Sequence, residues 1–476
     1  MVEHSYSLQE VEPVLAAHNQ TQLLRFWDEL SGDARERLAR QILAIDWHRL
    51  DNLIRNYVLQ APETNVPDDI QPAPYYALNP AGDEAATQYR QARKTGETLL
   101  QGGKVAGFTV AGGQGTRLGY DGPKGSFPIS PVRGKSLFQL FAESLLRARE
   151  KYDTAIPWYI MTSPMNDRDT RDFFSENEYF GIPDDDIFFF PQGTMPAIGY
   201  DGKLLLKRKD SLALSPDGHG GSLLALSRSG ALEDMRTRGI EHISYWQVDN
   251  PLVHTFDPLF LGLHAQTESD MSSRALMKTG PHEKLGNFCT VNGKLIVIEY
   301  SDIPDELAEA RDDDGRLRFR AGSPAIHILR REFVEQINDG GIKLPVHRAD
   351  KKVPHVDAGG NVIDPQEPNA VKLEMFIFDA LPLAENPLIL EADRREQFAP
   401  VKNRTGVDSA ESSRRLMSER AARWLENAGI TVPRTADGNV RCTIELSPRA
   451  YLDQDDVKNA SDDLQPPRPE EKAYYS

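Results

Sequence analysis

Cysteine is scarce in this chain, and long apolar runs are absent. The two cysteines, Cys289 and Cys442, stand in unrelated sequence contexts, so they form neither a disulfide framework nor a metal site. We interpret both as reduced packing residues. No stretch of about 18 apolar residues occurs, and the first residues lack a basic stretch followed by an apolar one. These absences predict no membrane partner and a cytoplasmic location.

Positive charge is also in deficit. Lysine and arginine number 55 against 72 aspartates and glutamates, which gives a net charge of -17. A chain this acidic is not expected to bind nucleic acid or anionic membranes, so a phosphate ligand needs a local basic pocket. Apolar residues make up 39% of the 476 residues, an ordinary share that can build the cores of two or three domains.

Glycine, by contrast, is concentrated between Val105 and Lys124, where the sequence reads VAGFTVAGGQGTRLGYDGPK. Val105 to Ala111 is a short apolar run typical of a strand buried on both faces of a parallel sheet. The glycines that follow allow the backbone to approach a ligand and to point N–H groups at phosphate oxygens. Arg117 and Lys124 add positive charge. The passage therefore predicts a binding site for a nucleoside triphosphate.

Two common nucleotide motifs fit this passage less well. A dinucleotide fingerprint requires glycine where Leu118 stands, which argues against an NAD-dependent dehydrogenase. A Walker A loop requires Gly-Lys-Ser/Thr after a spacing that the residues from Gly119 to Lys124 do not provide. An ordinary strand-to-helix turn is the remaining alternative, although a lysine and an arginine among the glycines favour a phosphate site.

Apolar spacing outlines the organisation of the chain. Apolar residues recur at helical spacing from residue 8 to about 58, and a further helix is predicted over 84–101. From 105 to about 380 short apolar runs alternate with helix-like stretches, as in a doubly wound α/β domain. Strands are expected at 105–111, 158–162, 187–191, 243–248, 295–299 and 325–329, and helices at 135–152 and 166–177.

The composition shifts toward charge after about Pro400. Residues 430–460 are expected to form a small β-rich unit with a strand at Thr443–Leu446, and the end from Gln465 is expected to be disordered. The predicted division is a helical N-terminal region at 1–98, a catalytic α/β domain at 99–398 and a small C-terminal domain at 399–476.

Residues that directly follow a strand are candidates for chemistry, because ligands of such sheets bind beyond the carboxyl ends of the strands. Asp249 follows an apolar run and can hold Mg²⁺ together with phosphates and water. The alternative is a turn residue before Pro251. Gln192 follows three phenylalanines and can present its amide to a pyrimidine, although a glutamine before glycine is otherwise unremarkable.

A second glycine-dense loop runs from Ser215 to Ser222. A flat base or ribose can lie against such a backbone, and a surface hairpin is equally compatible with the spacing. His219 in this loop is either a ligand contact or a tolerated turn residue. Lys372 and Lys402 are candidate cations for a second phosphate, or else solvated surface lysines.

These passages, taken together, resemble a known family. Ala111–Gly119 and Pro123–Gly125 are similar to the signature of UDP-N-acetylhexosamine pyrophosphorylases, within the wider UDP-sugar pyrophosphorylase family. The similarity continues in order through Ile156–Ser163, Pro191–Gly193, Pro216–Gly221, Val248–Asn250, Val297–Ser301, Lys372–Asp379 and Pro400–Asn403. It spans roughly residues 100–405.

The resemblance implies a fold and a reaction. The fold is an α/β, Rossmann-like nucleotidyltransferase core with a mixed, mostly parallel sheet, a helical N-terminal layer and a small β-rich C-terminal domain. In the reaction, UTP and a sugar 1-phosphate give a UDP-sugar and pyrophosphate, with Mg²⁺ as cofactor. The implied catalytic residues are Arg117, Lys124 and Lys402. The implied nucleotide-binding residues are Ala111, Gly112, Gly113, Lys124, Gln192, Gly220 and Asp249, with Asp249 also holding the metal. The implied sugar-binding residues are His219, Asn250, Gly286, Glu299, Ser323 and Lys372.

Two positions depart from the family pattern. The N-acetylhexosamine enzymes usually have Asn where Ser323 and His219 stand, and His at the second position is similar to the glucose-type enzymes. N-acetylglucosamine 1-phosphate is the expected substrate, and glucose or galactose 1-phosphate is the alternative. A non-catalytic UDP-sugar-binding regulator is a further alternative, which the presence of Lys124, Asp249 and Lys402 disfavours.

Overall fold

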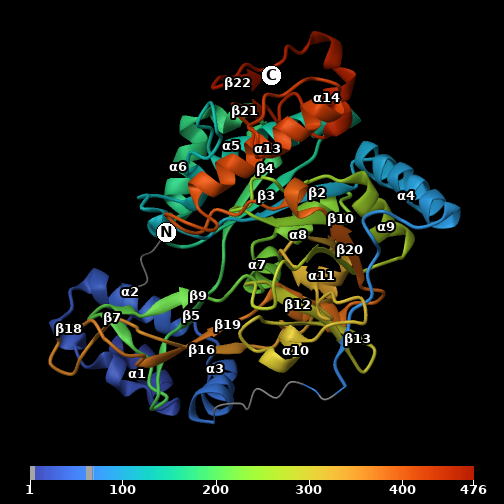
Figure 1. Cartoon of the computed structure of the whole chain (residues 1–476). Coiled ribbons are helices and arrows are strands. Elements are labelled where there is room, and N and C mark those ends of the chain that lie inside the picture. The colour runs from blue at the N-terminus through green and yellow to red at the C-terminus, as the bar shows by residue number, and fades with distance from the viewer. Residues whose placement is uncertain (1–5, 61–66, 68) are drawn as a thin grey trace. The chain divides into compact units, whose positions relative to one another are not determined.

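The computed structural model describes residues 6–60, 67 and 69–476, and its described residues form two compact units (Figure 1). The N-terminal unit draws on three segments of the chain: Met1–Asn65, Gly193–Gly221 and Leu344–Ile377. The core unit comprises Val66–Gln192, Ser222–Lys343 and Phe378–Ser476. Each unit is therefore discontinuous in sequence. The three-part division at 1–98, 99–398 and 399–476 stays a prediction.

Helices form the first segment of the N-terminal unit, as the apolar spacing predicts. They are α1 (Leu8–Ala17), α2 (Gly32–Leu43) and α3 (Trp47–Leu53), followed by a π-helical turn at Ile54–Leu59. Ser31 and Asp46 cap α2 and α3 by accepting the backbone N–H groups of Ala34 and Arg49. Leu38 and Ile42 of α2 are fully buried. The helical N-terminal layer is therefore confirmed.

The other two segments of this unit add short strands. They are β5 (Thr194–Pro196), β6 (Ile198–Gly199), β7 (Leu206–Arg208), β8 (Ser211–Leu212), β9 (Leu214–Pro216), β16 (His347–Lys351), β17 (His355–Val356), β18 (Val362–Ile363) and β19 (Ala370–Glu374). β16, β19 and β6 form one antiparallel sheet, and β5–β9, β7–β8 and β17–β18 form antiparallel pairs.

One large mixed sheet organises the core unit. Its parallel half consists of β2 (Val105–Val110), β3 (Trp158–Thr162), β4 (Ile187–Pro191) and β10 (His242–Gln247), in the order β10-β2-β3-β4. Nearly every residue of β2 and β3 is buried, which is the pattern that the apolar run at 105–111 predicts. The six predicted strands all exist, and their bounds shift by at most two residues.

The antiparallel half contains strands that the sequence analysis did not predict. It consists of β1 (Gln71–Pro72), β11 (Met271–Met277), β12 (Gly286–Val291), β13 (Lys294–Ile298), β14 (Ala321–Ser323) and β15 (His327–Arg330), and β20 (Leu388–Ala392) pairs parallel to β11. Polar residues hide β11 in the sequence, because Ser272, Ser273 and Arg274 interrupt its apolar run. All three are buried, and Arg274 forms an ion pair with Asp257.

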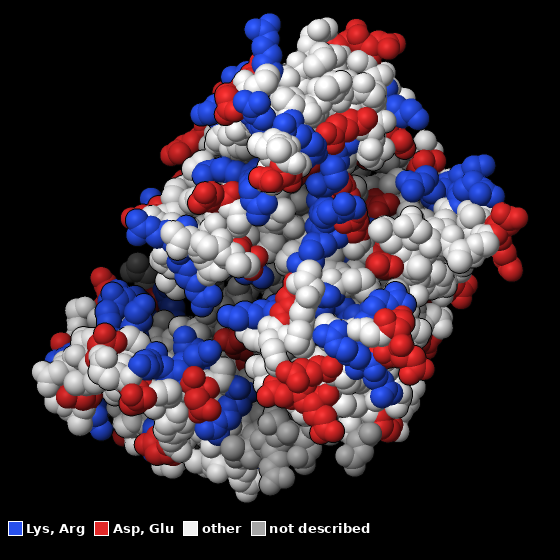
Figure 2. All heavy atoms as spheres, viewed as in Figure 1, with Lys and Arg blue, Asp and Glu red and all other residues white. Residues whose placement is uncertain are grey.

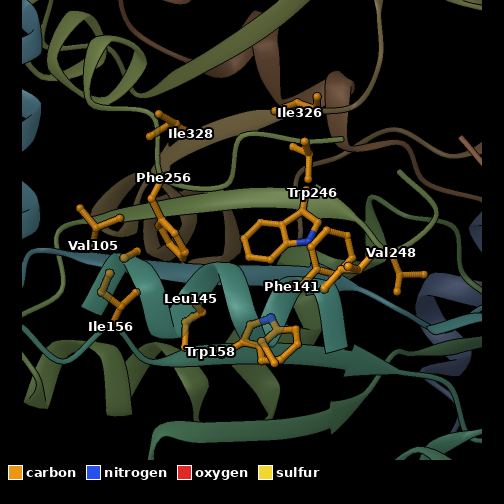
Figure 3. Close-up of a cluster of buried hydrophobic side chains, with 14 of the residues drawn as sticks. Val105, Phe141, Leu145, Ile156, Trp158, Trp246, Val248, Phe256, Ile326 and Ile328 are labelled. Carbon is orange, nitrogen blue, oxygen red and sulfur yellow. The ribbon is translucent and has the colours of Figure 1, made fainter. Parts of the chain in front are cut away.

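Helices flank the sheet and bury its faces. They are α4 (Asp83–Gln101), α5 (Leu137–Tyr152), α6 (Asp167–Glu176), α7 (Gly221–Arg228), α8 (Ala231–Thr237), α9 (Pro258–Gln266), α10 (Asp305–Glu309) and α11 (Arg331–Asn338). Figure 3 shows Phe141 and Leu145 of α5 among side chains of the parallel strands. The rings of Phe141 and Trp246 lie 5.6 Å apart, and a Cβ at Gly107 would meet the Trp246 indole at 2.9 Å. The absence of a Cβ at Gly107 of β2 therefore makes room for the indole of Trp246, which comes from the neighbouring strand β10.

The C-terminal segment forms its own hydrophobic cluster, around Trp424, Leu425 and Ile444. It contains α12 (Arg394–Gln397), α13 (Ala410–Asn427), β21 (Thr443–Leu446), α14 (Gln454–Asn459) and β22 (Lys472–Tyr475). The strand predicted at Thr443–Leu446 is confirmed, and the segment contains more helix than the description β-rich suggests.

The predicted disorder of the tail from Gln465 is wrong. The last residues form β22, which pairs parallel to β21 with Ile444 opposite Ala473. The Tyr474 hydroxyl accepts a hydrogen bond from Lys135 Nζ at 2.9 Å. Proline and charge in Gln465–Lys472 indicate disorder locally, but the aromatic residues that follow gain contacts with the cluster and fix the end of the chain.

The surface shows no uniform charge on the face drawn in Figure 2, where lysine and arginine are interspersed with aspartate and glutamate. Within the described part of the chain, none of the helices combines the length and the apolar character that a membrane span requires.

Candidate active site

A closed loop follows β2 in the core unit. Gly115 N–H donates to the Gly122 carbonyl at 2.9 Å, and Lys124 N–H donates to the Gly113 carbonyl at 3.0 Å. Gly119 has a φ of 72°, in the left-handed region that a side chain disfavours. These backbone bonds hold the glycine loop, defined as residues 111–124, in one shape and return Lys124 to the end of the strand.

Asn166 fixes the start of this loop, and the sequence analysis did not single it out. Its side chain is fully buried, and its Nδ2 donates to the carbonyls of Ala111 at 3.0 Å and Gly113 at 3.2 Å. Its Oδ1 accepts from Ser163 N–H at 2.7 Å. Carbonyls that are bound in this way leave the opposite edge of the loop for a ligand. The signal in the sequence was a polar residue shortly after the strand end at Thr162.

Gly112 and Gln192 lie against each other. A Cβ at Gly112 would collide with Gln192 Oε1. Gln192 is 8% exposed, and its N–H donates to the Thr162 carbonyl at 2.9 Å, directly after β4. The predicted nucleotide residues Ala111, Gly112, Gly113 and Gln192 are therefore neighbours, at the carboxyl ends of β2 and β4. The side-chain amide of Gln192 lies beside the backbone of Gly112, where there is no side chain.

Lys124 and Asp249 also meet at this edge of the sheet. Lys124 Nζ lies 3.8 Å from Asp249 Oδ2, and the two side chains are only 20% and 11% exposed. Asp249 follows β10, which is parallel to β2, so register alone brings its carboxylate to the glycine loop. The Asp249 carbonyl accepts the N–H of Val401 at 2.9 Å, which places Lys402 next in the chain. The structure thus groups three of the predicted functional residues.

The charge balance of this group is visible at Asp408. Burial raises the pKa of the Asp408 carboxyl, the nearby Lys402 lowers it, and the negative charge of Asp249 raises it again. Asp408 and Asp249 are therefore two carboxylates that affect each other, with two lysines beside them. Arg117 lies on the exposed side of the glycine loop and forms no hydrogen bond or ion pair with another described residue.

Asn250 has a different position from the one its predicted role suggests. Its Nδ2 donates to the Gln397 carbonyl at 2.7 Å, and its Oδ1 accepts from Ala399 N–H at 3.0 Å. The side chain is 5% exposed. Asn250 thus ties the end of β10 to the segment that leads to Lys402, and it positions the site through the backbone.

Three predicted sugar residues gather in the antiparallel half of the same sheet. Gly286 of β12 stands opposite Ser323 of β14, and a Cβ at Gly286 would lie 3.5 Å from Glu299 Oε1 and 2.6 Å from Val297. Ser323 Oγ accepts a long hydrogen bond, 3.4 Å, from Ala325 N–H. Gly286, Glu299 and Ser323 therefore form one group, with β11 and β15 between their strands and β10.

His219, Gly220 and Lys372 belong to the N-terminal unit. Gly220 N–H donates to the Met375 carbonyl at 2.8 Å, directly after β19, the strand of Lys372. His219 Nδ1 accepts from Ile377 N–H at 3.2 Å, and its ring stacks on Phe376 at 5.3 Å. Burial, and next the charge of His347, lower the pKa of His219 to about 4. A neutral His219 therefore fixes its loop against Met375–Ile377.

Cavity volume does not identify the site. A cavity of about 480 Å³ in the core unit is lined by His254, Trp424 and Arg420, among others, and includes none of the predicted site residues. The predicted site instead lies at the carboxyl ends of β2, β4 and β10, and the chemistry of its side chains identifies it.

The donor set at this edge suits magnesium bound together with phosphates. The described residues include no cluster of three His, Cys, Asp or Glu side chains that could hold a metal alone. Mg²⁺ commonly takes one or two carboxylates and completes its coordination with phosphate oxygens and water. Asp249, a largely buried carboxylate beside Lys124, fits that arrangement.

Comparisons with known proteins agree with the geometry. The chain is 37% identical over 425 residues to UDP-N-acetylhexosamine pyrophosphorylase-like protein 1 of Xenopus tropicalis, covering 86% of this chain and 83% of the relative. It is 37% identical to the UDP-N-acetylglucosamine pyrophosphorylase of Saccharomyces cerevisiae, covering 87% and 90%. The fold matches the uridine diphosphate N-acetylglucosamine pyrophosphorylase of Trypanosoma brucei, solved with an inhibitor, with a TM-score of 0.84 at 24% identity, covering 100% and 99%.

The family match covers most of the chain. Residues 52–461 match the family described as UTP–glucose-1-phosphate uridylyltransferase. The matched residues include the glycine loop, Asp249 and Lys402, as well as both groups of predicted sugar residues. The chain therefore belongs to this family of uridylyltransferases, as the resemblance of its motifs predicted.

Proposed function

We propose that this nucleotidyltransferase converts UTP and N-acetylglucosamine 1-phosphate into UDP-N-acetylglucosamine and pyrophosphate, with Mg²⁺ as cofactor. The names of the two sequence relatives support the N-acetylated sugar. The cytoplasmic location stays a prediction.

The observation that carries the proposal is the approach of Lys124 to Asp249 at 3.8 Å. An ion pair at the carboxyl ends of the strands suits a triphosphate, because the bound nucleotide and its metal can take the place of each side chain's partner. Lys124 would turn to phosphate oxygens, and Asp249 would hold the metal. The backbone N–H groups of the glycine loop would add further donors to the phosphates.

The reaction is a displacement at phosphorus. A phosphate oxygen of the sugar 1-phosphate attacks the α-phosphorus of UTP, the bond from that phosphorus to the bridging α–β oxygen breaks, and pyrophosphate leaves with the electron pair. No general base is needed, because the attacking oxygen is already anionic near neutral pH. The protein must align the two phosphates and neutralise their charge.

The residues at this edge are suited to those tasks. Lys124 and Arg117 would neutralise the triphosphate, and Lys402 would hold the sugar phosphate beside the α-phosphorus. Asp249 would hold Mg²⁺, which supplies further positive charge to the phosphates when bound. Gln192, with donor and acceptor atoms on one amide, would pair with the edge of the uracil.

The sugar residues are proposed as a separate recognition group. Glu299 and Ser323 would bind sugar hydroxyls, with Gly286 leaving room for the ring. The assignments of His219, Gly220 and Lys372 stay predictions. Asn250 is better described as a positioning residue, since both ends of its amide are bound to backbone.

Glucose 1-phosphate is the second candidate substrate. Ser323 supports it, because a serine at a position where an N-acetyl-specific enzyme usually has asparagine offers less hydrogen bonding to an acetamido group. The family description also names this sugar phosphate. Galactose 1-phosphate differs from glucose 1-phosphate in the orientation of one hydroxyl and is the third candidate substrate.

A pyrophosphate-release assay tests the proposal. Purified protein would be incubated with Mg²⁺, UTP and each of N-acetylglucosamine, N-acetylgalactosamine, glucose and galactose 1-phosphate, with ATP replacing UTP as the control. We expect the highest kcat/KM for N-acetylglucosamine 1-phosphate. Release with none of the sugars would overturn the enzymatic function, and UDP-sugar binding without release would identify a regulator.

A further inference from the structure

A small closed loop carries Lys402 to the glycine loop. Lys402 N–H and Asn403 N–H both donate to the Asp408 carbonyl, at 2.7 and 3.0 Å, and Asn403 Nδ2 donates to the Val407 carbonyl at 2.8 Å. Gly406 and Asp408 have φ values of 77° and 56°. These contacts make residues 402–408 a defined loop, although its outer residues are exposed.

Arg404 extends from this loop over the glycine loop. A Cβ at Gly119 would lie 3.6 Å from both Cδ and Nε of Arg404, and 3.7 Å from its Cζ. Three consecutive atoms of one side chain thus lie at van der Waals distance from the point that a Gly119 Cβ would occupy, so the absence of a side chain there leaves room for Arg404. Gly119 directly follows Thr116–Leu118, the 3-10 turn that contains Arg117.

Among the described residues, no carboxylate neutralises Arg404. Across residues 6–60, 67 and 69–476 its guanidinium forms neither a hydrogen bond nor an ion pair, and the same is true of Arg117. Asp121 on the glycine loop is exposed and pairs with neither. Farther along the chain, Arg423 pairs with Glu396 at 2.8 Å and Arg434 with Glu426 at 2.7 Å. Two adjacent unpaired arginines are therefore notable in a chain with a net charge of -17.

Two unpaired guanidinium groups at the same loop repel one another, and a bound polyphosphate removes that repulsion. Arginine also binds phosphate through two parallel N–H donors. Lys124 and Lys402 already stand near Asp249, at the inner end of the glycine loop. Arg117, and Gly119 beside which Arg404 lies, belong to the exposed part of the loop, so the group expected there is the far end of a triphosphate.

We propose that Arg404 binds the pyrophosphate portion of the nucleotide, that is, the β- and γ-phosphates of UTP and the pyrophosphate product, together with Arg117. This proposal rests on the function proposed above and adds a residue to it. The loop then holds Lys402 for the transferred phosphate and Arg404 for the leaving one, two residues apart on a single closed turn.

Steady-state kinetics in the reverse direction test the assignment, because pyrophosphate is then a separate substrate. Arg404→Ala is expected to raise the KM for pyrophosphate about tenfold, the usual loss for a charge-assisted hydrogen bond, and to leave the KM for the UDP-sugar unchanged. Arg404→Lys should recover part of the affinity. Arg415→Ala is the matched control, since Arg415 is an exposed arginine of α13 without a partner among the described residues.

A binding measurement separates this inference from the proposed function. Calorimetric titration of the protein with methylenediphosphonate, a pyrophosphate analogue, in the presence of Mg²⁺ needs no turnover. Weaker binding to Arg404→Ala than to Arg415→Ala supports the assignment whatever sugar the enzyme uses. Equal binding to both variants, or an equal loss of affinity for the UDP-sugar, would overturn it. A wild-type protein that releases no pyrophosphate would instead contradict the proposed function.

Discussion

The two halves of the core sheet hold their candidate residues by different means. In the parallel half, the glycine loop is fixed by backbone hydrogen bonds and by the buried amide of Asn166. In the antiparallel half, Gly286 and Ser323 are aligned by strand register, and among the described residues the Ser323 side chain has one long hydrogen bond. On the proposed function, we expect the main chain to specify the triphosphate side and side chains to specify the sugar side.

Lys402→Ala provides the largest test of the parallel half. Loss of a cation beside the transferred phosphate is expected to lower kcat about a thousandfold, with the Kd for UTP changed only a few-fold. Turnover and UTP titration on the same preparation measure both. Lys458→Ala in α14 is the control for loss of a lysine. Equal losses of kcat and UTP affinity would contradict the position of Lys402 at the reacting centre.

Gly112→Ala and Gly113→Ala separate packing from ligand approach. A Cβ at Gly112 collides with Gln192 Oε1, whereas one at Gly113 lies 3.7 Å from Lys124 Cε, an ordinary contact. Because Gln192 Oε1 ends a flexible side chain that can turn aside, we expect Gly112→Ala to destabilise the free protein by no more than about 1 kcal/mol and Gly113→Ala to leave its stability unchanged. UTP affinity should fall in both variants. An unaltered affinity in Gly113→Ala would show that the ligand does not approach that backbone.

A substitution at Asn166 tests whether its hydrogen bonds to loop carbonyls hold the glycine loop in shape. Asn166→Asp keeps the acceptor for Ser163 but loses the two donors and places a carboxylate near the carbonyls of Ala111 and Gly113. We expect a loss of about 2 kcal/mol in stability and weaker UTP binding. Denaturant unfolding and UTP titration measure the two effects. Normal binding at reduced stability would show that Asn166 supports the fold but not the nucleotide site.

The join between the two halves predicts a dependence on pH. His242 of β10 and His264 of α9 have rings 5.1 Å apart, and His264 Nδ1 bonds to Ser272 of β11 at 2.8 Å. Burial lowers the pKa of His242 to about 4, and it lowers the pKa of His264 well below the usual 6.5. Both are neutral in the folded protein, whereas the unfolded chain binds protons below about pH 6.5.

Stability is therefore full above pH 6.5 and decreases as the pH falls toward 4, by up to about 1.4 kcal/mol per pH unit for each histidine. Urea unfolding at pH 7.0, 6.0 and 5.0 measures this slope. His264→Gln should reduce it, and His48→Gln, at an exposed position of α3, should not. An identical slope in the wild type and His264→Gln would show that this pair does not carry the acid sensitivity.

The sequence predicts the parallel half well, for a physical reason. Strands buried on both faces read as apolar runs, and candidate site residues such as Gln192 and Asp249 follow directly at their carboxyl ends. β11 escaped prediction because its buried Ser272, Ser273 and Arg274 are satisfied by partners that no local pattern reveals. The order of the tail escaped prediction because β22 depends on pairing with β21, and the local composition of the tail does not reveal that partner.

Residues that act through the backbone were likewise beyond the reach of sequence patterns. Asn166 and Asn250 hold carbonyls and N–H groups of segments distant in the chain, so their role exists only after folding. The glycine loop and a strand end singled out Lys124 and Asp249, and the resemblance gave Lys402 its predicted role. The structure brings these three candidate residues together.

The smallest expected effect concerns the sugar side. Ser323→Asn adds an amide at a position that strand register already fixes opposite Gly286, so the main chain should not move. An amide can pair with an acetamido group through a separate donor and acceptor atom, whereas the serine hydroxyl has only one oxygen for both tasks. We expect kcat/KM for N-acetylglucosamine 1-phosphate to rise a few-fold relative to glucose 1-phosphate, with the KM for UTP unchanged. A change in UTP affinity would mean that the two halves of the sheet are coupled, and the division of labour between main chain and side chains would then fail.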